Sequence, residues 1–397
     1  MSFAGATDKP RPSPRVPGDL ARGNRTIFLG DSITLGGGTI TATNVQLGRE
    51  AWSTITCLIS KNRMRFLRNA GVGSETTAQM LARIYADVIA YAPDKCVVMG
   101  GTNDIGTSVP LATIQANIIA IVTALRIAGI VPILCTVPPR STKIPETAAL
   151  NRWLLWYADQ MGLQLLDFHA VLIDPATGGY KNGSAWSGDG VHPNGTSPTF
   201  PAVQAMAEYA VAQIAAWGDL FPDSEPWLTR DSTAGTGNLL LNGCFIGDSN
   251  LDGVANSWAM TGAGGTVTPS LEAGAGEVLG NWQVITATVA GQRTITQSVA
   301  SGWAVGDRLA LSGRFFASGV EASGMTTAVR LRFSGGNFLQ PIGSLVYDIT
   351  DGLFAIEGPV PAGTTTVDVD VFNGGSGTGV LKVAQLTLLN LTALGLV

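Results

Sequence analysis

Ser32 stands where a serine side chain can act as a nucleophile. It lies in Gly30-Asp31-Ser32, directly after the apolar residues 26–29. A serine that follows a buried strand is held at the carboxyl edge of a sheet, where open α/β sheets bind their ligands. Because a serine hydroxyl is a weak nucleophile until a base takes its proton, this interpretation requires a base elsewhere in the chain.

The chain has two histidines, and one of them has a carboxylate at a useful distance. His192 follows Asp189 in Asp-Gly-Val-His. This spacing lets the carboxylate meet one ring nitrogen while the other ring nitrogen faces Ser32. His169 is the rival base, but it has no carboxylate at a suitable offset beyond Asp167, and we interpret it as structural.

The developing negative oxygen of an acyl transfer needs hydrogen-bond donors that are already in place. Residues 69–74 (Asn-Ala-Gly-Val-Gly-Ser) follow the second apolar run and predict a tight turn. The backbone N–H groups of this turn can face Ser32, and both Gly73 and Ser74 are candidates. Asn103, which follows the third run in Gly-Thr-Asn-Asp, offers a side-chain amide.

Short apolar runs alternate with helical periodicity over the first half of the chain. The runs are residues 26–30, 66–70, 95–100, 131–137 and 163–167. Between them, apolar residues at i, i+4, i+7 and i+11 in residues 114–125 form one face of a helix. Strands that are apolar on both faces indicate a parallel sheet covered on both sides, so we predict a three-layer α/β domain.

The pattern changes after a turn-rich stretch at residues 222–237. Residues 329–333 and 367–371 alternate between apolar and polar, as half-buried antiparallel strands do. We predict a proline-rich arm at residues 1–25, the α/β domain at 26–221, a linker at 222–237 and a β-sandwich at 238–397.

Composition excludes several classes of partner. The net charge of −5 and the isoelectric point near 5.1 argue against nucleic acid and anionic membranes. No apolar run approaches the roughly 20 residues of a membrane span. The four cysteines lack metal-site spacing and predict buried free thiols. Residues 1–25 lack the apolar core of a signal peptide, so the chain either avoids general export or is a mature form.

Four sequence blocks together resemble the SGNH (GDSL-type) hydrolase family. They are Gly30-Asp31-Ser32, the turn at residues 69–73, Gly101-Thr102-Asn103-Asp104 and Asp189-x-x-His192, and the resemblance covers residues 26–221. It implies a flavodoxin-like domain with a parallel five-stranded sheet. It also implies ester hydrolysis through an acyl-enzyme without metal or cofactor.

The resemblance also implies a role for each matched residue. Ser32 would be the nucleophile, His192 the base and then the acid, and Asp189 the carboxylate that orients the ring. The Ser32 N–H, one N–H of the turn and the Asn103 amide would form the oxyanion hole. The family commonly has glycine where Ser74 stands, so Gly73 and Ser74 both remain candidates for the turn donor.

Residues 238–245, followed by Trp258, resemble the opening strand of jelly-roll carbohydrate-binding modules. Four aromatic residues could stack on sugar rings or fill the sandwich core: Trp258, Trp282, Trp303 and Tyr347. Trp52 and Trp186 pose the same question beside the predicted site. A spacer or oligomerisation role for this domain is equally allowed.

We expect an esterase that removes O-acetyl or other short acyl groups from a polysaccharide, in preference to a lipase or thioesterase. An acylated glycan would be its partner, and a homo-oligomer is allowed. The alternative is a non-catalytic, virion tail-like glycan-binding protein with a degenerate hydrolase domain. Either role suggests an extracellular or virion-associated protein. The second Gly-Asp-Ser, at residues 247–249, predicts a loop because no histidine follows it.

Overall fold

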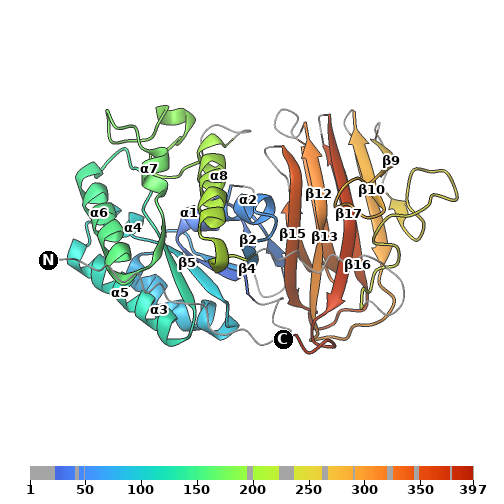
Figure 1. Ribbon diagram of the computed structural model, residues 1–397, viewed down its shortest axis with the longest axis horizontal. Coiled ribbons are helices and arrows are strands. Elements are labelled where there is room, and N and C mark those ends of the chain that lie inside the picture. Colours follow the sequence, from blue (N-terminus) through green and yellow to red (C-terminus); the bar gives the residue numbers. More distant parts are fainter. Residues whose placement is uncertain are drawn as a thin grey trace.

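The structure is a computed structural model that describes residues 23–40, 44–48, 50–194, 200–222, 237–261, 267–288, 291–319, 325–343, 348–375 and 378–396. An α/β domain lies beside a two-sheet β-sandwich (Figure 1). The predicted N-terminal arm and linker fall almost wholly outside the described residues.

The α/β domain contains a five-stranded parallel sheet in the order β4-β1-β5-β6-β7. Its strands are β1 (Arg25–Gly30), β4 (Arg65–Gly71), β5 (Lys95–Met99), β6 (Val131–Cys135) and β7 (Gln164–Leu166). This sheet confirms the predicted fold class. Each strand coincides with a predicted apolar run, and its two ends lie within two residues of the ends of that run.

Helices cover both faces of this sheet. Successive side chains of β1 point to opposite faces, and both sets are buried. Ile27 and Leu29 pack in one apolar cluster, and Phe28 packs in another. The Ile27 side is covered by α3 (Thr77–Asp87), α5 (Leu111–Ile127) and α6 (Ile144–Met161). The Phe28 side is covered by α2 (Trp52–Ile59) and α8 (Pro201–Ala216). Three short helices follow strand ends: α1 (Ser32–Leu35), α4 (Thr102–Gly106) and α7 (Phe168–Leu172).

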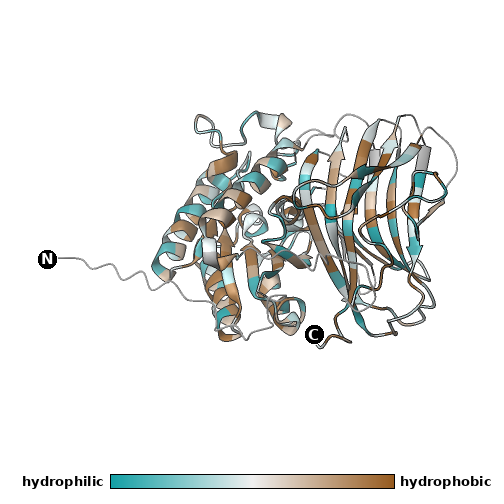
Figure 2. Ribbon diagram, turned by 45° about the vertical axis from the view of Figure 1, so that its right-hand side comes forward, coloured by the Kyte–Doolittle hydropathy of each residue, from teal (hydrophilic) through white to brown (hydrophobic). Residues whose placement is uncertain are grey.

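The second part of the chain is a sandwich of two antiparallel sheets, as predicted. One sheet has the order β15 (Ile349–Pro359), β12 (Arg308–Ser318), β17 (Gly379–Asn390), β10 (Asn281–Ala287) and β9 (Val267–Ala273). The other contains β14 (Phe338–Gly343), β13 (Met325–Phe333), β16 (Val367–Gly375), β11 (Gly291–Ser298) and β8 (Ala259–Thr261). Hydrophobic and hydrophilic residues alternate along these strands (Figure 2).

Two short strands of the α/β half extend the second sheet of the sandwich. They are β2 (Thr39–Ile40) and β3 (Asn44–Gln46), which lie between α1 and α2 in sequence. β3 pairs in parallel with β14, and the backbone N–H of Leu47 donates to Gln340 O at 3.2 Å. This sheet therefore contains strands from both sides of residue 222.

Charged side chains also join the two halves. Glu357 of β15 is buried and pairs with Arg65 and Arg25 of the α/β domain and with Arg308 of the sandwich. Lys61 and Asp351 form a second, exposed pair at 2.6 Å. No helix in the described ranges is both long and apolar enough to cross a membrane.

Candidate active site

The turn that carries Ser32 follows directly from its sequence. Asp31 caps α1, and its Oδ1 accepts the backbone N–H of Ile33 at 2.9 Å. A Cβ on Gly30 would lie 2.0 Å from Thr34 Oγ1 and 2.7 Å from Met99 O, so only glycine fits there. Ser32 is thus the first helical residue after β1, at the carboxyl edge of the sheet.

The structure brings the three predicted side chains together. Ser32 Oγ lies 2.7 Å from His192 Nε2, and His192 Nδ1 lies 2.6 Å from Asp189 Oδ2. The other carboxylate oxygen, Oδ1, accepts the backbone N–H groups of Val191 and His192, each at 2.8 Å. A continuous chain of hydrogen bonds therefore runs from the hydroxyl to the carboxylate.

The charge of Asp189 determines how the histidine ring is protonated. Burial raises the pKa of Asp189, but hydrogen bonds from the His192 backbone and ring and from the Val191 N–H outweigh it and lower the pKa to about 2. An ionised carboxylate only accepts hydrogen bonds, so it holds a proton on Nδ1. Nε2 is then free to accept the proton of Ser32.

A buried tyrosine supports the loop that carries this pair. Tyr180 donates its hydroxyl proton to the carbonyl of Val191 at 2.7 Å. Burial raises the pKa of Tyr180, and so does the nearby Asp189 carboxylate. The hydroxyl therefore stays protonated at neutral pH and remains a donor to the loop.

Asn69 builds the turn that follows β4. Its Oδ1 accepts the Gly71 N–H at 2.8 Å, and its Nδ2 donates to Thr34 O at 2.8 Å. Gly73 and Ser74 are exposed, and Ser74 has a left-handed φ of 65°. The turn is thus tied to the helix of the nucleophile, and either residue stays a predicted donor.

Asn103 is attached to the same turn. Its Nδ2 donates to the carbonyl of Glu75 at 2.9 Å. The neighbouring Asp104 is buried and accepts both the N–H (2.9 Å) and the hydroxyl proton (2.7 Å) of Thr77, the first residue of α3. These bonds hold the segment after β4 and the segment after β5 together.

The rival histidine and several of the aromatic candidates make contacts that stabilise the fold. The backbone N–H of His169 donates to Thr136 Oγ1 at 2.9 Å, whereas the hydrogen bond of Ser32 Oγ is to His192. Trp258 and Trp303 pack on the sandwich core and donate their indole N–H groups to the backbone. Trp186 packs against the core as well. Tyr347 lies outside the described residues.

The cavities in the described part of the α/β domain include a small one and a larger one, and Ser32 and His192 line the small one. It has a volume of about 120 Å³ and is lined by Ser32, His192, Trp52, Glu50 and six further residues. Trp52 is also 99% buried and packs on Phe28 and Phe168, so it serves both core and cavity. Sequence reasoning missed Glu50, which lies in no motif.

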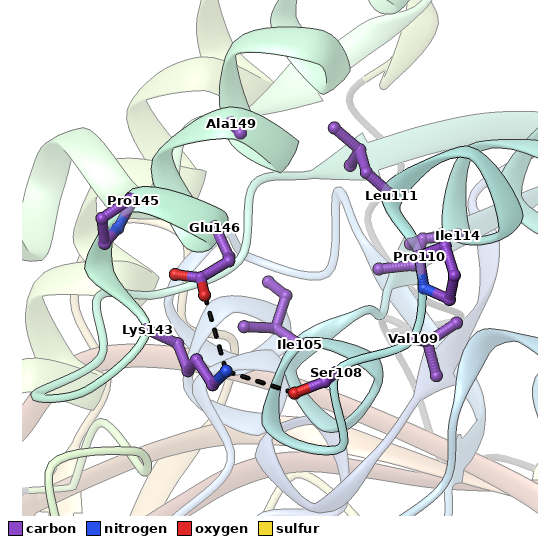
Figure 3. A pocket seen from close by; sticks show the side chains of 10 residues that line it. All are labelled: Ile105, Ser108, Val109, Pro110, Leu111, Ile114, Lys143, Pro145, Glu146 and Ala149. Atoms are coloured by element: carbon purple, nitrogen blue, oxygen red, sulfur yellow. Dashed lines mark hydrogen bonds and ion pairs between the residues drawn. The ribbon is translucent and has the colours of Figure 1, made fainter.

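The larger cavity, of about 480 Å³, shares no lining residue with the smaller one. It lies between the start of α5 and the start of α6, and its walls include Ile105, Leu111 and Ile114. Lys143 contacts Glu146 and Ser108 at its rim (Figure 3). It therefore contains none of the predicted catalytic groups.

The cysteines and the potential metal ligands of the described residues were also compared with the predicted site. Burial raises the pKa of the Cys57, Cys96 and Cys135 thiols, which disfavours the reactive thiolate. Among the described residues, no group of three or more His, Cys, Asp or Glu side chains is placed to hold a metal ion.

Residues 28–196 match the GDSL-like Lipase/Acylhydrolase family. This match confirms the resemblance found in the sequence. It lies within residues 26–221 and includes β2 and β3, but none of the later strands of the sandwich. No curated protein matched the chain.

Several solved structures are similar to this domain. A G-D-S-L family protein from Desulfitobacterium hafniense is 25% identical, with a TM-score of 0.40 over 48% of this chain and 98% of that chain. A GDSL-like lipase from Bacteroides thetaiotaomicron is 19% identical, with a TM-score of 0.40 over 51% and 92% of the two chains. The acetylxylan esterase Axe2 from Geobacillus stearothermophilus is 19% identical, with a TM-score of 0.41 over 52% and 99%.

Proposed function

We propose that this protein is a serine esterase that removes short acyl groups, above all O-acetyl groups, from a polysaccharide. The observation that carries this proposal is the hydrogen-bonded series Ser32–His192–Asp189, with distances of 2.7 Å and 2.6 Å. A hydroxyl, an imidazole and an ionised carboxylate in this order are the groups that nucleophilic ester hydrolysis needs.

In the first half-reaction, Ser32 Oγ attacks the ester carbonyl carbon while His192 Nε2 takes the hydroxyl proton. The N–H of Ser32, one N–H of the turn at Gly73 or Ser74, and the Asn103 amide stabilise the negative oxygen. His192 then gives its proton to the leaving alcohol oxygen, and an acyl-enzyme forms. In the second half-reaction, water attacks the acyl carbon while His192 takes a proton from it. His192 then returns the proton to Ser32 Oγ, which releases the carboxylic acid and the free serine.

The size of the cavity supports a short acyl group. About 120 Å³ beside Ser32 has room for an acetyl group. Its lining includes Trp52 and Glu50, and an acidic residue in the lining disfavours a purely apolar ligand. We therefore favour a carbohydrate ester over a lipid or a thioester.

The sandwich supports a polymeric substrate because it adjoins the cavity wall. Gly36 and Glu50 line the cavity, and the chain between them contains β2 and β3 of the sandwich sheet. A polysaccharide bound at Ser32 can therefore extend onto the second half of the molecule. The alcohol leaving group would be a sugar hydroxyl.

The test compares the wild-type protein with Ser32→Ala on 4-nitrophenyl acetate, 4-nitrophenyl decanoate and acetylated xylan. We expect acetate release by the wild type, little activity on the decanoate and background rates for Ser32→Ala. Ser249→Ala is the matched control, because Ser249 lies in the second Gly-Asp-Ser and bonds to Asn256 instead of a histidine. Equal acetate release by wild type and Ser32→Ala would refute the proposal.

A second candidate is a non-catalytic glycan-binding protein of a virion tail or another extracellular surface. One observation favours it: Ser74, where the family commonly has glycine, holds a left-handed φ of 65° beside the predicted oxyanion site. Glycan binding that persists in Ser32→Ala, with no turnover by the wild type, would support this function. Light scattering of the purified chain would test the homo-oligomer that such a surface role favours.

A further inference from the structure

Arg140 is a buried cation that the proposed mechanism does not use. It lies between β6 and α6, and only 8% of it is exposed. Its Nη1 donates to Thr102 O at 3.0 Å and to Thr102 Oγ1 at 2.7 Å. Its Nε has no hydrogen-bond partner, and no described carboxylate forms an ion pair with it. A buried charge without a counter-ion is costly, so the presence of an arginine at this position needs an explanation.

The guanidinium lies along helix α4, which carries Asn103. Thr102 is the first residue of α4 and directly precedes Asn103. At the other end of the helix, Arg140 Nη2 lies 3.3 Å from the position that a Cβ on Gly106 would take. Arg140 therefore contacts both ends of this one-turn helix, and its two bonds to Thr102 restrict how the helix can rotate.

The residue after Arg140 contacts the loop of the base. Ser141 N–H donates to the carbonyl of Gly190 at 2.9 Å. Gly190, which directly follows Asp189, has a left-handed φ of 74°, and a Cβ there would lie 2.0 Å from Ser141 Oγ. Both the backbone conformation and the close approach require glycine at this position.

The segment that carries Arg140 is itself fixed. The side chain of Asn151 in α6 accepts the Val137 N–H and donates to the Val137 carbonyl, each at 2.8 Å. Pro138 and Pro139 follow and are buried. Arg140 and Ser141 thus extend from a rigid anchor towards two different catalytic elements.

We infer that Arg140 is a positioning residue of the esterase site: with Ser141 it holds the Asn103 helix and the Asp189–His192 loop at a set separation. This inference rests on the proposed function, in which Asn103 donates to the oxyanion and His192 moves the proton. A shift of α4 would move the amide away from the negative oxygen while leaving ground-state binding almost unchanged. The loss should therefore fall on kcat and not on KM.

A double-mutant cycle on 4-nitrophenyl acetate tests this inference with Arg140→Met, Asn103→Ala and the double variant. We expect Asn103→Ala to lower kcat by about 10²- to 10³-fold. Arg140→Met should lower kcat by roughly tenfold or more, with KM within about twofold. If Arg140 acts through Asn103, the double variant loses no more than Asn103→Ala alone. Arg126→Met is the matched control, since the side chain of this half-buried arginine of α5 donates to Met161 O, away from α4.

The outcomes separate this inference from the proposed function. Wild-type protein that hydrolyses no ester would refute the proposed function, and the inference with it. Turnover by the wild type with full kcat in Arg140→Met, or multiplied losses in the double variant, would overturn the inference alone. Should Arg140→Met not fold, Thr102→Val removes only the Oγ1 acceptor and completes the same cycle.

Discussion

Replacing Asp189 by asparagine should invert the protonation of His192. Asp189 Oδ1 accepts the N–H groups of Val191 and His192, each at 2.8 Å, and only an oxygen can accept there. An asparagine must keep its oxygen at that place and turn its Nδ2 donors towards His192 Nδ1. Nδ1 then has to accept, so the ring proton moves to Nε2, which faces Ser32 and can no longer take its proton.

The size of this effect depends on how firmly the loop holds the amide. A complete inversion of this kind costs about 10⁴-fold in kcat. The side chain of Asp189 is 56% exposed, so water competes for Nδ1 and reduces the penalty. We expect a loss of about 10³-fold, which corresponds to roughly 4 kcal/mol of activation free energy.

The assay is steady-state hydrolysis of 4-nitrophenyl acetate by wild type, Asp189→Asn and Asp189→Ala. Alanine removes the carboxylate but leaves Nδ1 free to donate to water, so the productive ring tautomer survives. The asparagine variant should therefore be about tenfold slower than the alanine variant, although it is the closer match in shape. Equal rates, or a faster asparagine variant, would refute the tautomer argument.

Three stability predictions follow from buried or strained groups. Glu357→Gln leaves the buried Arg65 without its carboxylate and should lower the free energy of unfolding by about 3–5 kcal/mol in urea at pH 7. Burial raises the pKa of Glu357, but its arginines outweigh this and lower it, so the contribution exists above about pH 4.3 and is lost in acid. An unchanged urea midpoint would contradict this. Burial raises the pKa of Asp31 to about 7, so protonated Asp31 stabilises the folded state. This contribution to the free energy of unfolding is lost as the pH rises through about 7. The free energy of unfolding of Asp31→Asn should therefore exceed that of the wild type by up to about 4 kcal/mol at pH 8 and by less at pH 5. Thermal midpoints that shift equally at both pH values would exclude this prediction. Ser74→Gly should raise the thermal midpoint through about 1 kcal/mol of relieved left-handed strain, with kcat retained because the N–H remains.

The parallel sheet was predictable because its strands are buried on both faces. In β1 and β5 every side chain but one is buried, which leaves continuous apolar runs in the sequence. The catalytic candidates were predictable for a related reason. Ser32 follows a strand end, and Asp189 and His192 are neighbours in sequence, so local spacing was enough to associate them.

Contacts between distant segments were not predictable. β2 and β3 contain two and three residues, too few to show a period, and the partner strand β14 lies almost three hundred residues further along the chain. Arg140 gave no signal either, because its role depends on Thr102, which lies in helix α4, 38 residues earlier in the chain. Glu50 lines the cavity only because the chain returns there after the hairpin formed by the antiparallel strands β2 and β3.

This hairpin determines how the sandwich relates to the site. At its base, the Glu50 N–H donates to Gly36 O at 3.2 Å, and a Cβ on Gly48 would lie 2.1 Å from the same oxygen. The base is therefore closed next to Ser32, while β3 is paired with β14. Moving the sandwich as a unit would break this pairing and expose the buried Glu357–Arg65 pair, and separating buried charges is costly. The sandwich is thus fixed against the α/β domain, and a ligand that touched both halves would meet them in one orientation.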